Sequence, residues 1–465
     1  MFQYSVFYNF YELFADFFKL LSSHVRLNLE YNAMYLDSFK KTILQNNESF
    51  DPKLFYESLA NNYDNSLNEG LRTKRFTSIL SEYMNTLVDY RETQKRINVP
   101  VQYYDEALYQ IKKSLFHLSS AIDLECSSTA TPSEVVLKNG KIELLHYFTD
   151  KKNTLPIILV YAPINRFNLV DLKPNRSIVK NLISQGFDVY VLHWGYAGRQ
   201  DDGLTLDDYE NYLDEAISTI CQSHMMQKIS IIGYCWGGLL SVVYSALHGE
   251  KVESLTLMAT PIDFNKENSI LSVWSKDLDM DKIIDDFGHL DPLLLDTAFV
   301  MRNPFRNYEK YTNLLSKMDD PTFVNDFITL EKWLHNIPPI PGAFYRQIMN
   351  DCYKKNLLVS KKMHVNGKLV NLEKIDFPLL TVYAEKDDLI SPSSSLAIGE
   401  HISSKDRKII SIPSGHVGLI IGTSAHEKLW PEIGAWIKSK NINLTSSRLD
   451  SKPNTESKKE GLVTA

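Results

Sequence analysis

From about residue 140 onwards, the chain alternates between short apolar runs and longer stretches in which apolar residues recur every three or four positions. The short runs have the length and composition of buried β-strands: residues 156–162, 187–193, 229–234, 252–258, 379–384 and 408–412. The longer stretches have the period of amphipathic helices: residues 177–185, 206–222, 239–247 and 394–401. Strands that alternate with helices predict an α/β fold, with a mostly parallel sheet covered by helices on both faces.

One connection interrupts this alternation. Residues 262–372 separate two of the predicted core strands and contain the turn cluster Pro338-Pro339-Ile340-Pro341. Helical patterns recur within this segment at residues 279–287, 323–334 and 343–355. Because insertions of this length between core strands usually carry function, we expect a helical lid over a site. The segment 441–465 is rich in Ser, Thr, Lys and Asn and has no aromatic residue, which predicts a disordered tail.

Residues 1–99 form a region of their own, ahead of the α/β domain that we place at 100–440. Apolar residues recur at helical spacing from Phe7 to Leu21 and again around Ile79 to Tyr90, which predicts an N-terminal helical extension. The region contains no chemical motif. Two interpretations stay open: an accessory domain that packs on the rest of the chain, or an amphipathic surface for a partner or a lipid-like particle.

Composition narrows the class of protein. The 465 residues carry a net charge of −7, which argues against broad nucleic-acid binding. The four cysteines lie far apart and form no C-x-x-C pair, so we expect neither a metal site nor a disulfide framework, and a reducing, cytoplasmic compartment. The first residues lack the basic segment of a signal peptide, and no apolar run reaches the roughly 18 residues of a transmembrane helix.

The stretch Gly233-Tyr234-Cys235-Trp236-Gly237 joins a predicted strand to a predicted helix. This G-x-C-x-G pattern stands where many hydrolases carry G-x-S-x-G, the sharp turn that projects a nucleophile above a sheet. Glycines on both sides let the backbone approach its neighbours closely. The helix N-terminus favours a thiolate at Cys235, and the N–H of Trp236 is a candidate donor to an oxyanion.

A thiol nucleophile also requires a base and an orienting acid, which in hydrolases with this turn follow later strands. His416 follows the strand at 408–412, and Asp387 and Asp388 follow the strand at 379–384. Asp387 is the preferred acid, and Asp388 is the alternative. Neighbouring loop side chains seldom share a direction, so we expect only one of the two to face His416.

The loop after the strand at 156–162 is expected to supply the second oxyanion donor, a backbone N–H of Ile164 or Asn165. Arg166 in the same loop could bind a phosphate or carboxylate, or could pair with an acid such as Asp171. His193, at the end of another strand, is a weaker candidate for lining the site.

Several separated motifs resemble the polyhydroxyalkanoate synthases, over about residues 100–440. They are "GYCWGG" at 233–238, "NRFNLVDLKPNRSIVKNLISQGFDVYVLHWGY" at 165–196, "GLTLDDYENYLDEAI" at 203–217, "EKWLHNIPPIPGAFYRQIMNDCYKKNLLV" at 331–359, "YAEKDDLISPSSS" at 383–395 and "SGHVGLIIG" at 414–422. The resemblance is to the class III type, whose catalytic subunit works with a second subunit. It departs at His193, where the family commonly has Asp, at Asp388, where it usually has His, and at Ser391, where it usually has Pro.

The resemblance implies an α/β-hydrolase fold and a catalytic set of Cys235, Asp387 and His416. It implies transfer of (R)-3-hydroxyacyl groups, such as 3-hydroxybutyryl, from coenzyme A to a growing polyester through a cysteine acyl intermediate. No cofactor is expected beyond the coenzyme A thioester, which is the substrate. The implied setting is the cytoplasmic surface of a polyester granule, with a second synthase subunit or a homodimer as partner.

Two other functions stay open from the residues alone. A cysteine-dependent α/β-hydrolase acting on esters or lactones needs the same three side chains. A non-catalytic granule-surface protein could keep the fold, although the complete set of Cys235, Asp387 and His416 argues against it.

Overall fold

The computed structural model describes residues 129–441, except 149–153, 278, 291, 303–309, 311–312, 315–316, 318–319 and 335. The predicted extension at 1–99 and the predicted tail after Asn441 lie outside the described residues. Nearly all described elements belong to one compact unit, residues 125–315 and 326–465.

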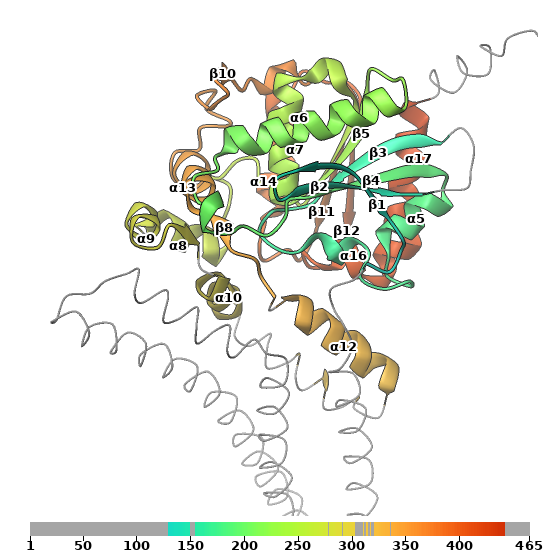
Figure 1. Cartoon of the computed structure of the whole chain (residues 1–465), viewed down its shortest axis with the longest axis horizontal. Coiled ribbons are helices and arrows are strands. Elements are labelled where there is room, and N and C mark those ends of the chain that lie inside the picture. The colour runs from blue at the N-terminus through green and yellow to red at the C-terminus, as the bar shows by residue number, and fades with distance from the viewer. Residues whose placement is uncertain are drawn as a thin grey trace, which may run out of the picture. The chain divides into compact units, whose positions relative to one another are not determined.

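An eight-stranded sheet organises the described part of the chain, in the order β1-β2-β4-β3-β5-β6-β11-β12 (Figure 1). The strands are β1 (Glu134–Asn139), β2 (Ile142–Tyr147), β3 (Leu155–Val160), β4 (Phe187–His193), β5 (Ile229–Tyr234), β6 (Val252–Met258), β11 (Leu379–Ala384) and β12 (Arg407–Ile412). The six strands from β4 to β12 in this order run parallel, as predicted. All six predicted strands are present, with ends that shift by no more than two residues.

The hairpin of β1 and β2 adds two antiparallel strands at one edge of the sheet, and the apolar pattern did not predict it. Most of β1 is exposed, with only Leu137 partly buried, so this strand lacks the apolar run of a core strand. At the centre of the sheet, every residue of β5 is buried. Burying one large aliphatic side chain stabilises a fold by about 1.5–3 kcal/mol, so the central strands are the firm frame on which the site stands.

Helices cover both faces of the sheet (Figure 1). α6 and α7 lie together on one side, and α5 and α17 lie together on the other. Their bounds are α5 (Ile178–Ser184), α6 (Leu206–Ser223), α7 (Trp236–Leu247), α14 (Pro392–Leu396), α15 (Ile398–His401), α16 (Gly418–Ile421) and α17 (Trp430–Lys440). Ser177 begins α5 by accepting the Lys180 N–H at 2.9 Å, a side-chain cap for an otherwise unpaired helix-end donor.

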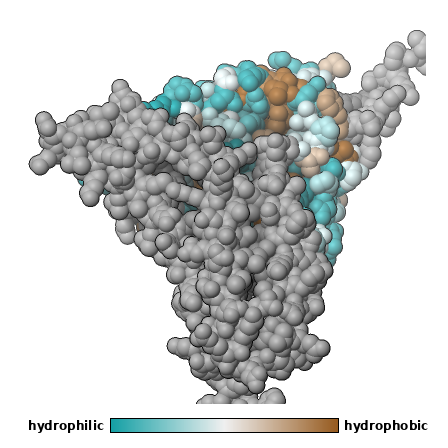
Figure 2. All heavy atoms as spheres, turned by 60° about the horizontal axis from the view of Figure 1, so that its bottom comes forward, coloured by the Kyte–Doolittle hydropathy of each residue, from teal (hydrophilic) through white to brown (hydrophobic). Residues whose placement is uncertain are grey.

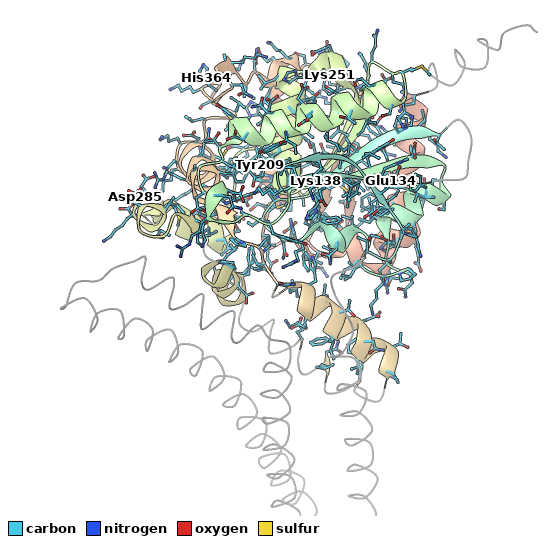
Figure 3. All side chains as sticks on the ribbon, viewed as in Figure 1. Glu134, Lys138, Tyr209, Lys251, Asp285 and His364 are labelled. Carbon is cyan, nitrogen blue, oxygen red and sulfur yellow. The ribbon has the colours of Figure 1, made fainter. Side chains whose placement is uncertain are left out.

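The segment between β6 and β11 is largely helical, as predicted. Its helices are α8 (Ile270–Asp277), α9 (Met280–Phe287), α10 (Pro292–Met301), α12 (Pro321–Leu334) and α13 (Gly342–Gln347), followed by a π-helical turn at Ile348–Lys354. Two short strand pairs, β7 (His289–Leu290) with β8 (Ile340–Pro341) and β9 (His364–Val365) with β10 (Lys368–Leu369), complete it. Tyr209 of α6, labelled in Figure 3, stacks on Phe344 of α13 at 4.1 Å and ties this segment to the core. Whether the segment acts as a lid stays a prediction.

The surface of the described residues is mixed. Figure 2 shows hydrophilic residues interspersed with hydrophobic areas on the visible part of this surface. Among the helices of the described part, none is both long enough and apolar enough to cross a membrane.

Candidate active site

Cys235 occupies the sharp turn between β5 and α7. Its backbone has φ 54° and ψ −124°, a conformation that costs a non-glycine residue about 1–3 kcal/mol. Two hydrogen bonds hold the turn: the Cys235 N–H donates to the Met258 carbonyl at 2.9 Å, and the Leu239 N–H donates to the Cys235 carbonyl at 3.1 Å. The strained turn predicted from G-x-C-x-G is therefore present, and it leaves Cys235 buried, with 7% of the residue exposed.

The glycines of the motif allow β5, α7 and β3 to meet closely. A Cβ at Gly233 would lie 2.6 Å from the Cα of Gly238, and one at Gly237 would lie 2.1 Å from the Val160 carbonyl oxygen. Neither distance leaves room for a methyl group. The close approach at Gly237 brings the N-terminus of α7 against the carboxyl end of β3, where the loop with Ile164 and Asn165 begins.

Asp387 and His416 meet above the ends of β11 and β12. Nδ1 of His416 lies 2.7 Å from Oδ2 of Asp387, and both side chains are almost fully buried. Oδ1 of Asp387 accepts the backbone N–H groups of Leu389 at 2.9 Å and Ile390 at 3.0 Å. Both carboxylate oxygens thus have partners, and the direction of the carboxylate is fixed.

Cys235 and Asp387 both interact electrostatically with His416, so thiol, imidazole and carboxylate form one interacting series. Because Nδ1 faces Asp387, Nε2 is the ring nitrogen left for the thiol. Burial lowers the pKa of His416, but the charges and hydrogen bonds of Asp387 and Cys235 outweigh burial and raise this pKa to about 10. Burial likewise raises the pKa of Asp387, but His416 and the two backbone N–H groups outweigh it and hold this pKa below its usual value. The series therefore favours charge on the imidazole and the carboxylate.

Asp388 points elsewhere, as expected of an adjacent loop side chain. Its Oδ2 lies 3.3 Å from Nε of Arg302. Asp387, the preferred candidate, therefore lies at His416, whereas Asp388, the alternative, lies at Arg302.

The part of the site that is expected to stabilise an oxyanion lies between α7 and the loop after β3. The N–H of Trp236 belongs to the first turn of α7, where backbone donors have no acceptor within the helix. In the loop, Oδ1 of Asn165 accepts the N–H of Arg166 at 2.6 Å. Which backbone donor of Ile164 or Asn165 would face a substrate stays a prediction.

Comparison with known proteins finds two family models that match the chain. Residues 170–423 match the family model for the alpha/beta hydrolase fold, and residues 110–182 match that for the Poly-beta-hydroxybutyrate polymerase (PhaC) N-terminus. A Poly(3-hydroxyalkanoate) polymerase subunit PhaC from Thiocystis violacea is 34% identical over 343 residues, which cover 73% of this chain and 95% of the relative. The chain belongs to the poly(3-hydroxyalkanoate) polymerase family. The α/β-hydrolase fold predicted for it is confirmed.

Two further relatives with the same description extend the match. The one from Allochromatium vinosum is 34% identical and covers 72% of this chain and 95% of the relative. The one from Haloferax mediterranei is 36% identical and covers 70% of this chain and 68% of the relative.

In this member of the family, aromatic side chains of the long segment surround Trp236. Its Nε1 donates to the Tyr353 hydroxyl at 3.3 Å, and its ring lies 6.1 Å from that of Tyr345. Tyr353 is buried and packs on Phe264 at 4.6 Å. The sequence reasoning did not single out these residues, although Tyr345 and Tyr353 recur at helical spacing in a predicted helix. They enclose the residue next to Cys235 in apolar surroundings.

Glu267 is a second feature that the sequence did not reveal. Its buried carboxylate accepts the backbone N–H of Ser391 at 2.6 Å, in the loop that follows Asp387. Burial, with the charge of Asp387, raises the pKa of Glu267. Ser391 stands where the family usually has proline, which has no N–H to donate.

The remaining two candidates have structural partners. Arg166 donates to Asn336 at 2.7 and 2.9 Å, whereas the Asp171 carboxylate accepts from Thr131, so the suggested pair of Arg166 with Asp171 is wrong. Nδ1 of His193 lies 3.6 Å from Glu143. Burial lowers the pKa of His193, which favours its neutral form.

Proposed function

We propose that this chain is a polyhydroxyalkanoate synthase in which Cys235, His416 and Asp387 carry acyl transfer. Its substrate would be an (R)-3-hydroxyacyl-coenzyme A, such as 3-hydroxybutyryl-coenzyme A. Membership of the family supports the polymerase activity. The observation that carries the residue assignment is the 2.7 Å hydrogen bond between Asp387 and His416, together with the electrostatic interaction of His416 with Cys235.

In the first step, the proton of the Cys235 thiol passes to Nε2 of His416, which gives the thiolate–imidazolium pair that the raised pKa of His416 favours, and the thiolate attacks the thioester carbonyl. The oxyanion that forms accepts the N–H of Trp236 and a second N–H from Ile164 or Asn165. The carbon–sulfur bond to coenzyme A then breaks, and His416 returns the proton to the departing thiolate. The acyl group remains on Cys235 as a new thioester.

In the second step, a 3-hydroxyl group attacks this thioester. Nε2 of His416 takes the hydroxyl proton as the carbon–oxygen bond forms, and the Cys235 thiol is regenerated when the proton is passed to its sulfur. Asp387 holds the imidazole in the tautomer that both steps require. The products are one ester bond and one free coenzyme A for each monomer added.

A thiol suits this reaction better than a hydroxyl. Exchange of one thioester for another is nearly balanced in free energy, whereas an ester on serine would be a less reactive acyl store. The acyl-enzyme must also survive until a hydroxyl arrives, so water must be kept out. The aromatic side chains around Trp236 and a lid formed by residues 262–372 would serve that purpose.

The remaining parts of the proposal concern place and partners. The reaction needs no cofactor besides the thioester substrate. The enzyme would act at the surface of a polyester granule in the cytoplasm. Residues 1–99 would do part of the work of a second synthase subunit or bind it, so that deleting residues 1–95 would weaken activity and granule binding. Unchanged activity and binding after the deletion would contradict this role.

The decisive experiment incubates the purified chain with 3-hydroxybutyryl-coenzyme A and follows free coenzyme A and turbidity. The wild type should release coenzyme A and form insoluble polymer. Cys235→Ala should do neither, whereas Cys221→Ala, a change of a partly buried thiol on α6, should behave as wild type. Release of coenzyme A with only soluble hydroxy acid would instead indicate a cysteine-dependent hydrolase. No release by the wild type, with or without a second synthase subunit added, would indicate a non-catalytic protein.

A further inference from the structure

Two buried polar groups at the candidate active site, one donor and one acceptor, are left unpaired among the described residues. The donor is the hydroxyl of Tyr353, which accepts the Nε1–H of Trp236 at 3.3 Å. Because an indole N–H can only donate, the O–H of Tyr353 itself has no acceptor in the described part of the chain. The acceptor is Oε2 of Glu267. Oε1 of this carboxylate accepts the Ser391 N–H at 2.6 Å, whereas Oε2 is buried with no hydrogen-bond partner among the described residues.

Unpaired polar groups at this depth call for an explanation. Tyr353 is 8% exposed and Glu267 is 4% exposed, so neither group can turn freely to bulk water. Leaving a buried donor or acceptor unpaired is costly, and native proteins do so mainly where a ligand, a water molecule or a reaction uses the group. Tyr353 also lies in the π-helical turn Ile348–Lys354, a rare geometry that is frequent at functional sites.

The fold brings both groups to the nucleophile. Cys235 directly follows β5, Glu267 lies in the loop after β6, and Asp387 follows β11. These three strands are neighbours and run parallel, so their carboxyl ends meet at one edge of the sheet, with the loop of Glu267 between the other two. Burial raises the pKa of the Tyr353 hydroxyl, and the charges of Glu267 and Cys235 raise it further. Tyr353 therefore stays a neutral donor within electrostatic reach of both the carboxylate and the thiol.

We propose that Tyr353 and Glu267 together bind the 3-hydroxyl group of the acyl chain, with Tyr353 donating to its oxygen and Oε2 of Glu267 accepting its hydrogen. The inference rests on the proposed function, in which Cys235 carries the acyl group. A hydroxyl both accepts and donates, so it matches one unpaired donor beside one unpaired acceptor. In a 3-hydroxyacyl group this hydroxyl lies only two carbons from the carbonyl carbon that bonds to the thiol. The pair would therefore select 3-hydroxyacyl thioesters over plain acyl thioesters.

The competing occupant is a water molecule that bridges the two groups, since water also donates and accepts. The two occupants differ in one measurable respect. A bridging water would support the site equally with every substrate, whereas a site that binds the substrate hydroxyl loses that contact when the substrate has none. A site built to hydrogen-bond a substrate hydroxyl discriminates strongly against the analogue that lacks it, because its own polar groups are then left unpaired.

The test measures single-turnover release of coenzyme A, with the enzyme in excess, from 3-hydroxybutyryl-coenzyme A and from butyryl-coenzyme A, which lacks the hydroxyl. The wild type should favour the hydroxylated substrate by about 10²-fold. Tyr353→Phe removes only the hydroxyl of the ring and should lower this preference by about tenfold. Any loss that arises because Trp236 Nε1 has lost its acceptor is common to both substrates and cancels in the ratio. Tyr209→Phe, which removes the hydroxyl of another buried ring, should leave both rates unchanged.

Glu267→Gln tests the acceptor. Because the Ser391 N–H can only donate, the amide would keep its oxygen there and place its NH2 group where Oε2 stands. This change replaces an acceptor by a donor and should also lower the preference by about tenfold. A wild type without the preference, or variants that slow both substrates equally, would overturn this inference alone, in favour of a bridging water or a purely structural role. A wild type that releases no coenzyme A from either substrate, with or without a second synthase subunit added, would overturn the proposed function itself.

Discussion

Replacing Asp387 by asparagine removes a negative charge without changing the size of the side chain, and the structure dictates how the new amide would lie. Oδ1 of Asp387 accepts two backbone N–H groups at 2.9 and 3.0 Å, and Oδ2 faces Nδ1 of His416 at 2.7 Å. Because the two N–H groups can only donate, the amide would keep its oxygen toward them and turn its NH2 group to His416. Nδ1 would then have to accept, and the imidazole proton would move to Nε2.

That tautomer removes the lone pair that would take the proton of Cys235. Loss of a general base costs about 10²–10⁴-fold in rate, and a wrong tautomer in a comparable triad costs about 10⁴-fold. We therefore expect Asp387→Asn to slow acylation by about 10³–10⁴-fold. Asp388→Asn is the matched control. Its carboxylate is 29% exposed and pairs with Arg302 at 3.3 Å, a partly exposed contact worth about 0–1 kcal/mol, so the rate should fall less than about fivefold.

The assay is single-turnover release of coenzyme A from 3-hydroxybutyryl-coenzyme A, with urea unfolding as a check that each variant is folded. A folded Asp387→Asn that keeps its rate within tenfold of wild type would refute the tautomer argument. If Asp388→Asn lost activity in its place, the acid role would pass to Asp388. The roughly tenfold limit is chosen because it lies well below the smallest expected loss from a missing base.

Three further predictions concern stability and are all measured by urea unfolding. Although burial lowers it, neighbouring negative charge raises the pKa of His416 to about 10, so its stabilising contribution is complete below about pH 6.5 and is lost as the pH rises to about 10. The stability difference between wild type and His416→Gln should therefore shrink over that interval, and a constant difference would contradict the assignment. Glu267→Ala should lower the free energy of unfolding by about 1–3 kcal/mol because the Ser391 N–H loses its buried acceptor. Glu267→Gln keeps an acceptor and should lower this free energy by less. Equal losses in the two variants would show that this hydrogen bond is unimportant. Gly237→Ala should lower the free energy of unfolding by about 3 kcal/mol or prevent folding, because its Cβ would lie 2.1 Å from a β3 carbonyl oxygen. Gly203→Ala, where the new Cβ meets open space, should leave the free energy of unfolding nearly unchanged. A stable Gly237→Ala would disprove the close packing.

The core of the fold was predictable because its signals are local. Central strands such as β5 are continuous apolar runs, since both of their faces are buried, and the helices between them repeat at their own period. The exposed strand β1 carries no such signal, and pairing with β2 rather than burial makes it a strand. The helix α17 was missed although its apolar residues recur at three- and four-residue spacing from Trp430 to Ile437.

The candidate site was likewise predictable only in part. The sequence by itself determined the sharp turn at Cys235 and the position of His416 after a later strand, because glycine spacing and strand order are written along the chain. Only the tertiary structure decided that Asp387, and not Asp388, meets the imidazole, because adjacent loop side chains differ in direction and that direction depends on distant partners. The partner of Arg166 was likewise decided only by the tertiary structure. Asn336 lies 170 positions further along the chain, and no local sequence pattern relates two residues that only folding brings within hydrogen-bonding distance.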